Sequence, residues 1–235
     1  MSNLQTLRFY ATPPHDCSYL PGRKAKTLFV DPQASITPEI YSELSDLGFR
    51  RSGSHIYRPH CDNCNACVSV RIPTRFFAPS KTQRRIWRRN DDLKVKQVPA
   101  QLTIEYYRLY DRYITERHAD GDMYPPSPSQ FMSFLVEGKQ PSCFYEFRDP
   151  DNQLICIAVT DMLDQGLSAL YTFYAPDQEK RSLGTYAILW QVEEAKRQGL
   201  DYLYLGYWVR DCRKMNYKTA YRPLDMLIAD RWVRV

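Results

Sequence analysis

The sequence predicts an α+β fold in two parts: a small loop-rich domain over residues 1–98 and a more regular domain over residues 99–235. Two observations lead to this prediction. The first part holds short apolar runs separated by proline, glycine and polar residues, whereas the second holds long runs with helical or alternating periodicity. With 235 residues, 43% hydrophobic and 14% aromatic, the chain can bury a sizeable core, which excludes a disordered protein.

The N-terminal part should contain short strands and two helices. The first helix opens at Thr37 and ends before Gly48. The second begins at Ser80, which can form a capping box with Gln83, and covers residues 81–90. The strands are expected over residues 7–10, 27–30, 55–58, 68–72 and 93–98.

The C-terminal part shows a longer series of elements. Apolar residues at helical spacing predict a helix over residues 102–113, and Ser127 caps a second one. A final helix follows Ser182 and is closed by Gly199. Between and after these helices, strands are expected over residues 143–148, 154–163, 167–174 and 202–205, the first three as an antiparallel meander.

This order of elements resembles the acyltransferase fold of the GNAT superfamily, so we expect a C-terminal GNAT-like acyltransferase domain. In that fold the turn before the central helix offers backbone N–H groups to a phosphate-bearing donor. Ser182 and Gly184 occupy this turn and are therefore candidates for contact with donor phosphates.

Positive charge is concentrated in one segment. Residues 71–96 hold nine basic and two acidic residues, although the whole chain carries only +5. Such a concentration is typical of a surface that binds nucleic-acid phosphates, and a solvated helix face is the alternative. The candidates for contact with a nucleic acid are Lys81, Arg84, Arg85, Arg88 and Arg89.

Cysteines form a second cluster. Cys61, Cys64 and Cys67 are spaced two residues apart, and with Cys17 as a fourth ligand they could hold zinc or an iron–sulfur cluster. His15 and His60 are alternative fourth ligands, and reduced thiols that pack a loop without metal remain a further alternative. The odd total of seven cysteines argues against a disulfide framework.

The sequence also bears on localisation. The N-terminus lacks an apolar signal region, and no segment approaches the roughly 18 uninterrupted apolar residues of a membrane span. We therefore expect a cytoplasmic protein without membrane partners.

Specific motifs resemble a known family, the aminoacyl-tRNA–protein transferases of the arginyltransferase family. The compact length resembles its bacterial aspartate/glutamate leucyltransferase branch. The motifs that carry the resemblance extend over nearly the whole chain: Gly48-Phe-Arg-Arg-Ser-Gly53, Tyr57-Arg-Pro59, Pro79-Ser-Lys-Thr82 with Arg84-Arg85, Leu170-Tyr-Thr-Phe-Tyr174, Ser182-Leu-Gly184, and Lys214-Met-Asn-Tyr-Lys218 with Tyr221-Arg-Pro223.

The resemblance implies that leucine is transferred from leucyl-tRNA to the N-terminal Asp or Glu of acceptor proteins, which marks them for degradation. The chemistry requires no cofactor, because an aminoacyl ester is already activated and aligning amine and ester supplies most of the acceleration. Two alternatives stay open: arginine as the donor amino acid with the same acceptors, and a metal-stapled nucleic-acid-binding module without catalysis. An arginine pocket needs a carboxylate, for which Glu146 and Asp161 are candidates.

The site candidates fall into two further groups. Asp161 is a candidate base or amine-binding residue, although it could instead cap a turn. Tyr171, Tyr174 and Tyr207 could donate to the ester or stack on the terminal adenosine, although tyrosines at this density are also typical of a core. Lys218 could contact a phosphate or the oxyanion. For the acidic side chain of the acceptor, the candidates are Arg51, Arg71 and Arg75, any of which could bind tRNA instead.

Overall fold

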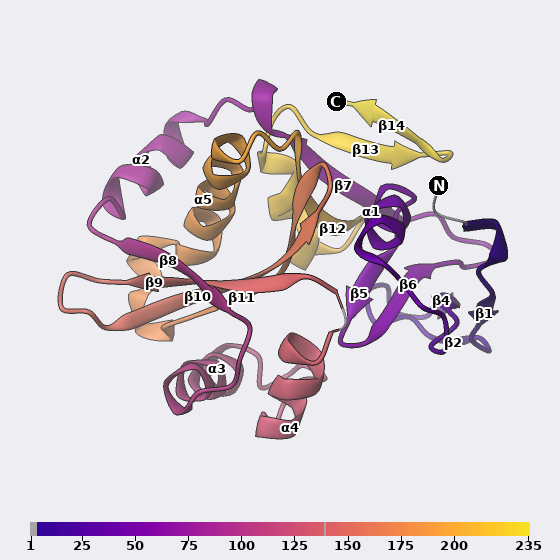
Figure 1. Ribbon diagram of the computed structural model, residues 1–235, viewed down its shortest axis with the longest axis horizontal. Helices are drawn as coiled ribbons and strands as arrows, with labels where there is room; N and C mark the ends of the chain where they lie inside the picture. Colours follow the sequence, from indigo (N-terminus) through magenta and orange to yellow (C-terminus); the bar gives the residue numbers. More distant parts are fainter. Residues whose placement is uncertain (1–3, 139) are drawn as a thin grey trace.

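An eight-stranded mixed sheet dominates the computed structural model, which describes residues 4–138 and 140–235 (Figure 1). The strand order is β14-β13-β7-β12-β11-β10-β9-β8. Neighbouring strands are antiparallel except for β11 and β12, which are parallel. The strands are β7 (Cys67–Pro73), β8 (Lys94–Pro99), β9 (Ser142–Arg148), β10 (Leu154–Leu163), β11 (Gly166–Tyr174), β12 (Tyr202–Val209), β13 (Asp225–Ile228) and β14 (Arg231–Arg234).

A smaller antiparallel sheet with the order β1-β4-β6-β5 packs beside it, covered by helix α1 (Pro38–Asp46). Thr37 caps α1 as predicted, because its hydroxyl accepts a hydrogen bond from the Ile40 N–H. The small sheet contains β1 (Phe9–Ala11), β4 (Thr27–Val30), β5 (Arg50–Ser52) and β6 (His55–Pro59); β2 (His15–Asp16) and β3 (Lys24–Ala25) form a separate two-stranded ribbon.

Helices cover both faces of the large sheet. Figure 1 shows α2 (Lys81–Arg89) and α5 (Leu183–Arg197) on one face, and α3 (Ile104–Arg117) and α4 (Pro128–Phe131) on the other. None of the helices in the described ranges is long and apolar enough to span a membrane. Further helical segments are the 3₁₀ helices η1 (Leu4–Thr6), η2 (Thr74–Phe76), η4 (Pro176–Arg181) and η5 (Arg213–Ala220) and the π-helical η3 (Met132–Val136).

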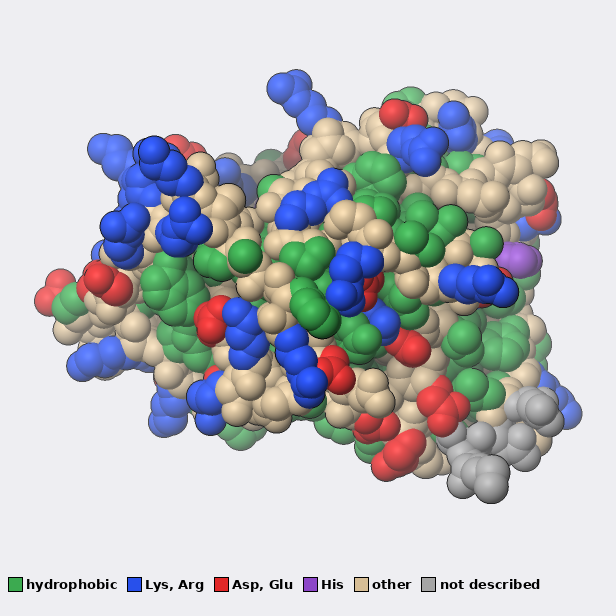
Figure 2. All heavy atoms as spheres, turned by 90° about the horizontal axis from the view of Figure 1, so that it is seen from above, with side chains coloured by type: hydrophobic (Ala, Val, Ile, Leu, Met, Phe, Trp, Pro, Cys, Tyr) green, Lys and Arg blue, Asp and Glu red, His purple; other side chains and the backbone are tan. Residues whose placement is uncertain are grey.

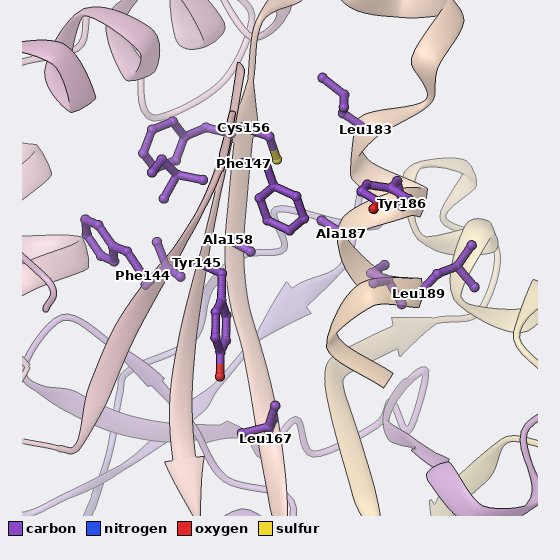
Figure 3. Packing of buried hydrophobic residues seen from close by; sticks show 14 of the residues in the cluster. Phe144, Tyr145, Phe147, Cys156, Ala158, Leu167, Leu183, Tyr186, Ala187 and Leu189 are labelled. Atoms are coloured by element: carbon purple, nitrogen blue, oxygen red, sulfur yellow. The ribbon is translucent and has the colours of Figure 1, made fainter. Parts of the chain in front are cut away.

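The main core lies between the large sheet and its helices. Figure 3 shows Tyr186 and Ala187 of α5 directed toward Phe147, Cys156 and Ala158 on the strands. Phe144 lies on the other face of β9 and packs against Tyr106 of α3. The alternation of side chains along a strand thus buries both faces of the meander.

The predicted meander and the helices after Thr37, Ser80, Ser127 and Ser182 are confirmed. Each of the predicted strand segments also overlaps an observed strand. β7 and β8, which the sequence placed in the N-terminal part, lie in the large sheet, so segments on both sides of residue 98 build one layer. The mixed α+β class is therefore confirmed, with the two parts joined through a shared sheet.

Candidate functional site

The parallel strands β11 and β12 separate after a short pairing. Their register runs only from Gly166 opposite Tyr202 to Ser168 opposite Tyr204, although β11 continues to Tyr174 and β12 to Val209. Figure 1 shows the two strands leaving this pairing in different directions. Because the separated edges no longer bond each other, their backbone groups need other partners.

Bulges mark the place where the strands part. The register shifts in β10–β11 and in β12–β7 leave Leu170 and Leu205 as extra residues. Gly206 follows directly, with φ +76°, a backbone conformation that side chains with a Cβ rarely adopt. The bulges and Gly206 thus lie where β11 and β12 separate, a place called the opening below.

Two cationic side chains bond to carbonyls of the separated strands. Arg50 Nη2 donates to the Ala169 carbonyl on β11 at 3.3 Å, and Lys218 Nζ donates to the Tyr207 carbonyl on β12 at 2.6 Å. Arg50 comes from β5 and Lys218 from η5, and they are only 6% and 5% exposed. The structure thus gathers two buried basic groups, one guanidinium and one amine, where the strands separate.

The electrostatics of this pair are unusual. Burial, reinforced by the nearby Arg50 guanidinium, lowers the pKa of Lys218 to about 7. Arg50 Nη1 is buried and has no hydrogen-bond partner, and neither residue takes part in an ion pair with any residue of the described ranges. An anion bound here would therefore meet an uncompensated positive charge.

A group of aromatic side chains lies at the end of β11. Tyr174 is 4.9 Å from Tyr113 between ring centroids, and Tyr113 is 4.9 Å from the His118 ring and 6.4 Å from Tyr171. Gly184 lies next to Tyr174, because a Cβ there would be 3.4 Å from its ring. The structure therefore brings together the predicted residues Tyr171, Tyr174 and Gly184.

The turn before α5 completes this end of the site. Ser182 adopts a left-handed conformation with φ +54°, and the 15-residue helix begins directly after it. The first turn of a helix presents N–H groups without intrahelical partners and a partial positive charge. The tyrosine group and this helix end thus border the same region.

Tyr207 is placed differently from the other tyrosines. Its hydroxyl donates to the Gly48 carbonyl at 2.7 Å and is buried, so the predicted donation to a substrate ester is not supported. Its backbone carbonyl, rather than its ring, belongs to the site through Lys218.

Asp161 and Arg51, predicted as base and acceptor-binding residue, bind each other. Arg51 Nη2 is 2.5 Å from Asp161 Oδ1, and Arg51 Nε donates to Oδ2 at 3.0 Å, where the Tyr41 hydroxyl also donates at 2.6 Å. Arg51 Nη1 donates to the Gly53 carbonyl. Because both oxygens are occupied and the carboxylate is 0% exposed, the group acts as a structural ion pair, which corrects both roles.

The other two predicted acceptor-binding arginines also have internal partners. Arg71 is buried, pairs with Asp46 and Asp225 and stacks on the Tyr202 ring with its Cζ 3.5 Å from the centroid. Arg75 is exposed but pairs with Asp201 at 2.9 Å, beside the end of β12 opposite to the opening. Their assignment to the acceptor is therefore corrected as well.

Helix α2 presents a basic surface. Its five cations Lys81, Arg84, Arg85, Arg88 and Arg89 are exposed, and Figure 2 shows blue side chains gathered over this end of the molecule. The predicted capping box of Ser80 and Gln83 starts the helix. At the other end, Asn90 Nδ2 donates to the Arg181 carbonyl at 2.9 Å, which ties the helix to the turn before α5.

The cysteines near residues 61–67 lie in one region. Cys17, Cys64 and Cys67 pack around the same small core, while Cys61 bonds to the backbone of Lys26. Burial and the neighbouring thiols raise the pKa of Cys67 to about 12. Within the described ranges no three His, Cys, Asp or Glu residues are arranged so that they could hold a metal ion, so the side-chain positions do not fit a preformed zinc or iron–sulfur site.

Sequence reasoning missed Arg50. Either arginine of the Arg50-Arg51 pair on β5 could have been the acceptor-binding residue. The alternation of the strand did not show which of the two side chains faces the opening. The available signal was Gly206, because an isolated glycine inside a strand indicates a bulge or a close approach of another group.

Two family models match the chain. Residues 15–85 match "Arginine-tRNA-protein transferase, N terminus", and residues 105–228 match "Arginine-tRNA-protein transferase, C terminus".

Similar proteins cover almost the full length. The chain is 60% identical over 232 residues to a protein from Marinobacter nauticus named aspartate/glutamate leucyltransferase, covering 99% of this chain and 98% of the relative. A protein of the same name from Pseudomonas fluorescens is 58% identical, with 99% of each chain covered. Among solved structures, L-PGS from Bacillus licheniformis aligns at a TM-score of 0.47 and 12% identity, covering 69% of this chain and 49% of that one.

Proposed function

This chain belongs to the arginine-tRNA-protein transferase family, and we propose that it transfers leucine from leucyl-tRNA to the N-terminal Asp or Glu of acceptor proteins. The observation that carries the proposal is identity of 58–60% with two proteins named aspartate/glutamate leucyltransferase along nearly their whole length. The product carries a new N-terminal leucine and becomes a target for degradation. Because the proposed reaction consumes leucyl-tRNA, we propose that the protein acts in the cytoplasm.

The topology supports a GNAT-like acyltransferase core. The parallel strands β11 and β12 separate after a short pairing. The positively polarised N-terminus of α5 lies beside the end of β11. We assign the 3′ end of leucyl-tRNA to the side of Gly184, Tyr171 and Tyr174, where the rings can stack on the terminal adenosine.

Lys218 is the proton acceptor in this proposal. The acceptor's α-ammonium group titrates near pH ~8, and it must lose a proton before it attacks the ester carbonyl. A lysine with a pKa of about 7 is largely neutral under these conditions and can take that proton. The amine then attacks the ester carbonyl and forms the new peptide bond. As the ester C–O bond breaks, the second proton lost by the nitrogen ends on the 3′-terminal ribose oxygen, so the tRNA leaves with a free hydroxyl.

Two carboxylates bear on the choice of leucine over arginine as donor. Asp161 is occupied by Arg51 and Tyr41. Glu146 accepts from the Tyr106 hydroxyl at 3.0 Å and from Arg148 at 3.2 Å, and it is buried. Because Asp161 has partners on both oxygens and Glu146 is already paired with Arg148 through Oε2, the two carboxylates favour an apolar donor side chain over a guanidinium.

We assign tRNA phosphates to α2. Charge reversal at Arg84, Arg85 and Arg88 should weaken tRNA binding and lower its salt dependence, since each lost duplex phosphate contact removes about 0.9 from the slope of log K against log salt. A matched control reverses three exposed cations outside α2: Arg8, Arg108 and Arg231. Equal salt slopes for the two triple variants, measured by filter binding, would contradict the assignment.

Zinc or an iron–sulfur cluster on Cys17, Cys61, Cys64 and Cys67 is a separate proposal, for which the thiol side chains would have to move and lose protons. Its support is the clustering of these thiols around one small core. Metal analysis and a visible spectrum after anaerobic purification test it, and metal-free protein with unchanged activity would refute it.

The deciding experiment is a transfer assay with tRNA charged with labelled leucine or arginine and peptides beginning with Asp, Glu, Lys or Ala. Leucine incorporated only into the Asp and Glu peptides is the expected result. Arginine incorporation would replace the donor in the proposal. Absence of incorporation from both donors would favour a nucleic-acid-binding module without catalysis.

A further inference from the structure

We propose that Arg50 binds the side-chain carboxylate of the acceptor's N-terminal Asp or Glu at the opening between β11 and β12. The inference rests on the proposed function, since it assigns the acceptor to a place in the same site. It makes Arg50 the residue that distinguishes acidic from neutral N-termini.

Arg50 is a buried cation with an unused hydrogen-bond donor. Arg50 is 94% buried, yet within the described residues its side chain makes a single hydrogen bond, from Nη2 to the Ala169 carbonyl, and Nη1 has no partner. A buried guanidinium without a carboxylate is costly, and proteins normally pair such groups. A ligand that supplies the missing anion therefore removes this cost when it binds.

The Arg50 guanidinium is also held in position by both strands. Nη2 is fixed on β11, and the group lies against Gly206 of β12, where an added Cβ would be 3.4 Å from Nε and 3.6 Å from Nη2. Ala169 of β11 and Gly206 of β12 thus form one binding socket around the Arg50 guanidinium. A pre-positioned planar donor is suited to a planar carboxylate, because less side-chain freedom is lost on binding.

Of the two substrates, the acceptor is the one that supplies a carboxylate for Arg50. The aminoacyl end of leucyl-tRNA carries an ammonium group and an ester but no carboxylate, so its anions are phosphates. The acceptor brings a carboxylate within a few bonds of the amine that reacts. Lys218 lies so close to Arg50 that the charge of Arg50 helps to lower the pKa of Lys218. A carboxylate bound at Arg50 therefore places the reacting amine beside the proton acceptor.

The test compares Arg50→Met and Arg50→Lys with the wild type on peptides beginning with Asp and with Asn, at saturating leucyl-tRNA. Loss of a hydrogen-bonded charge contact of about 1.5–3 kcal/mol corresponds to a roughly 10- to 150-fold higher KM for the Asp peptide. We expect the preference for Asp over Asn to collapse in Arg50→Met, to recover partly in Arg50→Lys, and the KM for leucyl-tRNA to stay unchanged.

The control is Arg58→Met. Arg58 lies on the neighbouring strand β6 and donates to the Leu47 carbonyl, so its loss changes the net charge equally without touching the opening. A folded Arg50 variant that keeps the Asp preference would overturn the proposal. So would an increase in KM for leucyl-tRNA in place of the acceptor, which would assign Arg50 to a phosphate.

Direct binding separates this inference from the proposed function. Calorimetric titration with Asp and Asn peptides, without tRNA, should show tighter binding of the Asp peptide to the wild type and no difference for Arg50→Met. That result would support the carboxylate site even if the wild type transferred no leucine. Equal affinity of the wild type for both peptides would refute it even if leucine transfer were observed.

Discussion

Arg50 and Arg51 are neighbours on β5 with opposite environments. Successive residues of a strand point to opposite sides. Here all the guanidinium nitrogens of Arg51 have hydrogen-bond partners, whereas Nη1 of Arg50 has none. Arg51 uses three nitrogens on Asp161 and Gly53, whereas Arg50 uses one on Ala169. The comparison shows how one residue type serves as a structural link on one face and as a binding group on the other.

The Arg51 side of the comparison joins the two sheets. Asp161 belongs to β10 of the large sheet, Arg51 to β5 of the small one, and Tyr41 to the helix that covers the small sheet. The surrounding groups raise the pKa of Tyr41, chiefly through burial and the Asp161 carboxylate, so its hydroxyl stays a donor. Every polar atom of this side is thus committed within the protein.

The strongest way to test the comparison is to remove one arginine at a time. Arg51→Met leaves Asp161 buried without its counter-charge and should lower the free energy of unfolding by about 3–5 kcal/mol. Arg50→Met removes a cation that lacks an anionic partner and should change it by less than about 1 kcal/mol. Urea unfolding followed by circular dichroism measures both.

The double variant Arg51→Met/Asp161→Leu provides the control. Because it removes both charges together, it should recover most of the loss. Equal destabilisation by Arg50→Met and Arg51→Met would mean that Arg50 is as structural as its neighbour.

Lys218 offers a second test through pH. Its pKa is about 7 in the folded protein against an ordinary value of 10.5, so between these values the unfolded chain binds a proton that the folded chain does not. The free energy of unfolding should therefore rise with pH in this window, with a slope of up to about 1.4 kcal/mol per pH unit.

The measurement is the difference in free energy of unfolding between wild type and Lys218→Met across pH 7 to 10. The titration of other groups cancels in this difference. A constant difference would show that Lys218 stays protonated on folding. In that case its proposed role as proton acceptor would fail, while a role as a cation beside Arg50 would remain consistent.

Local sequence signals predicted the secondary structure well because they act within a few residues. The capping residues Thr37 and Ser80 start their helices as expected, and the short turns of the meander specify antiparallel neighbours. The hairpin β13–β14 was not predicted, because it depends on a distant contact: Asp225 pairs with Arg71 on β7 and with Arg234.

The site was predicted only in part, because its chemistry depends on which partners the fold supplies. Lys218, Tyr171 and Tyr174 were singled out and lie around the strand opening. Asp161 and Arg51 are residue types that often act in catalysis or binding, yet here they form an ion pair with each other. A sequence shows that a charge is present, whereas only the fold shows whether that charge already has a partner.

The smallest expected effect comes from Gly206, which supports Arg50 from β12. Gly206→Ala should cost about 1–2 kcal/mol from its positive φ, and its methyl group would pack directly against the Arg50 guanidinium, 3.4 Å from Nε, and restrict it. Gly199→Ala is the matched control, since Gly199 has φ +73° and open space around it. Both variants should lose similar stability in urea unfolding, but only Gly206→Ala should raise the KM for an Asp peptide. If the two variants gave the same acceptor KM, the contact between Gly206 and Arg50 would have no part in acceptor binding, and the socket would reduce to β11 alone.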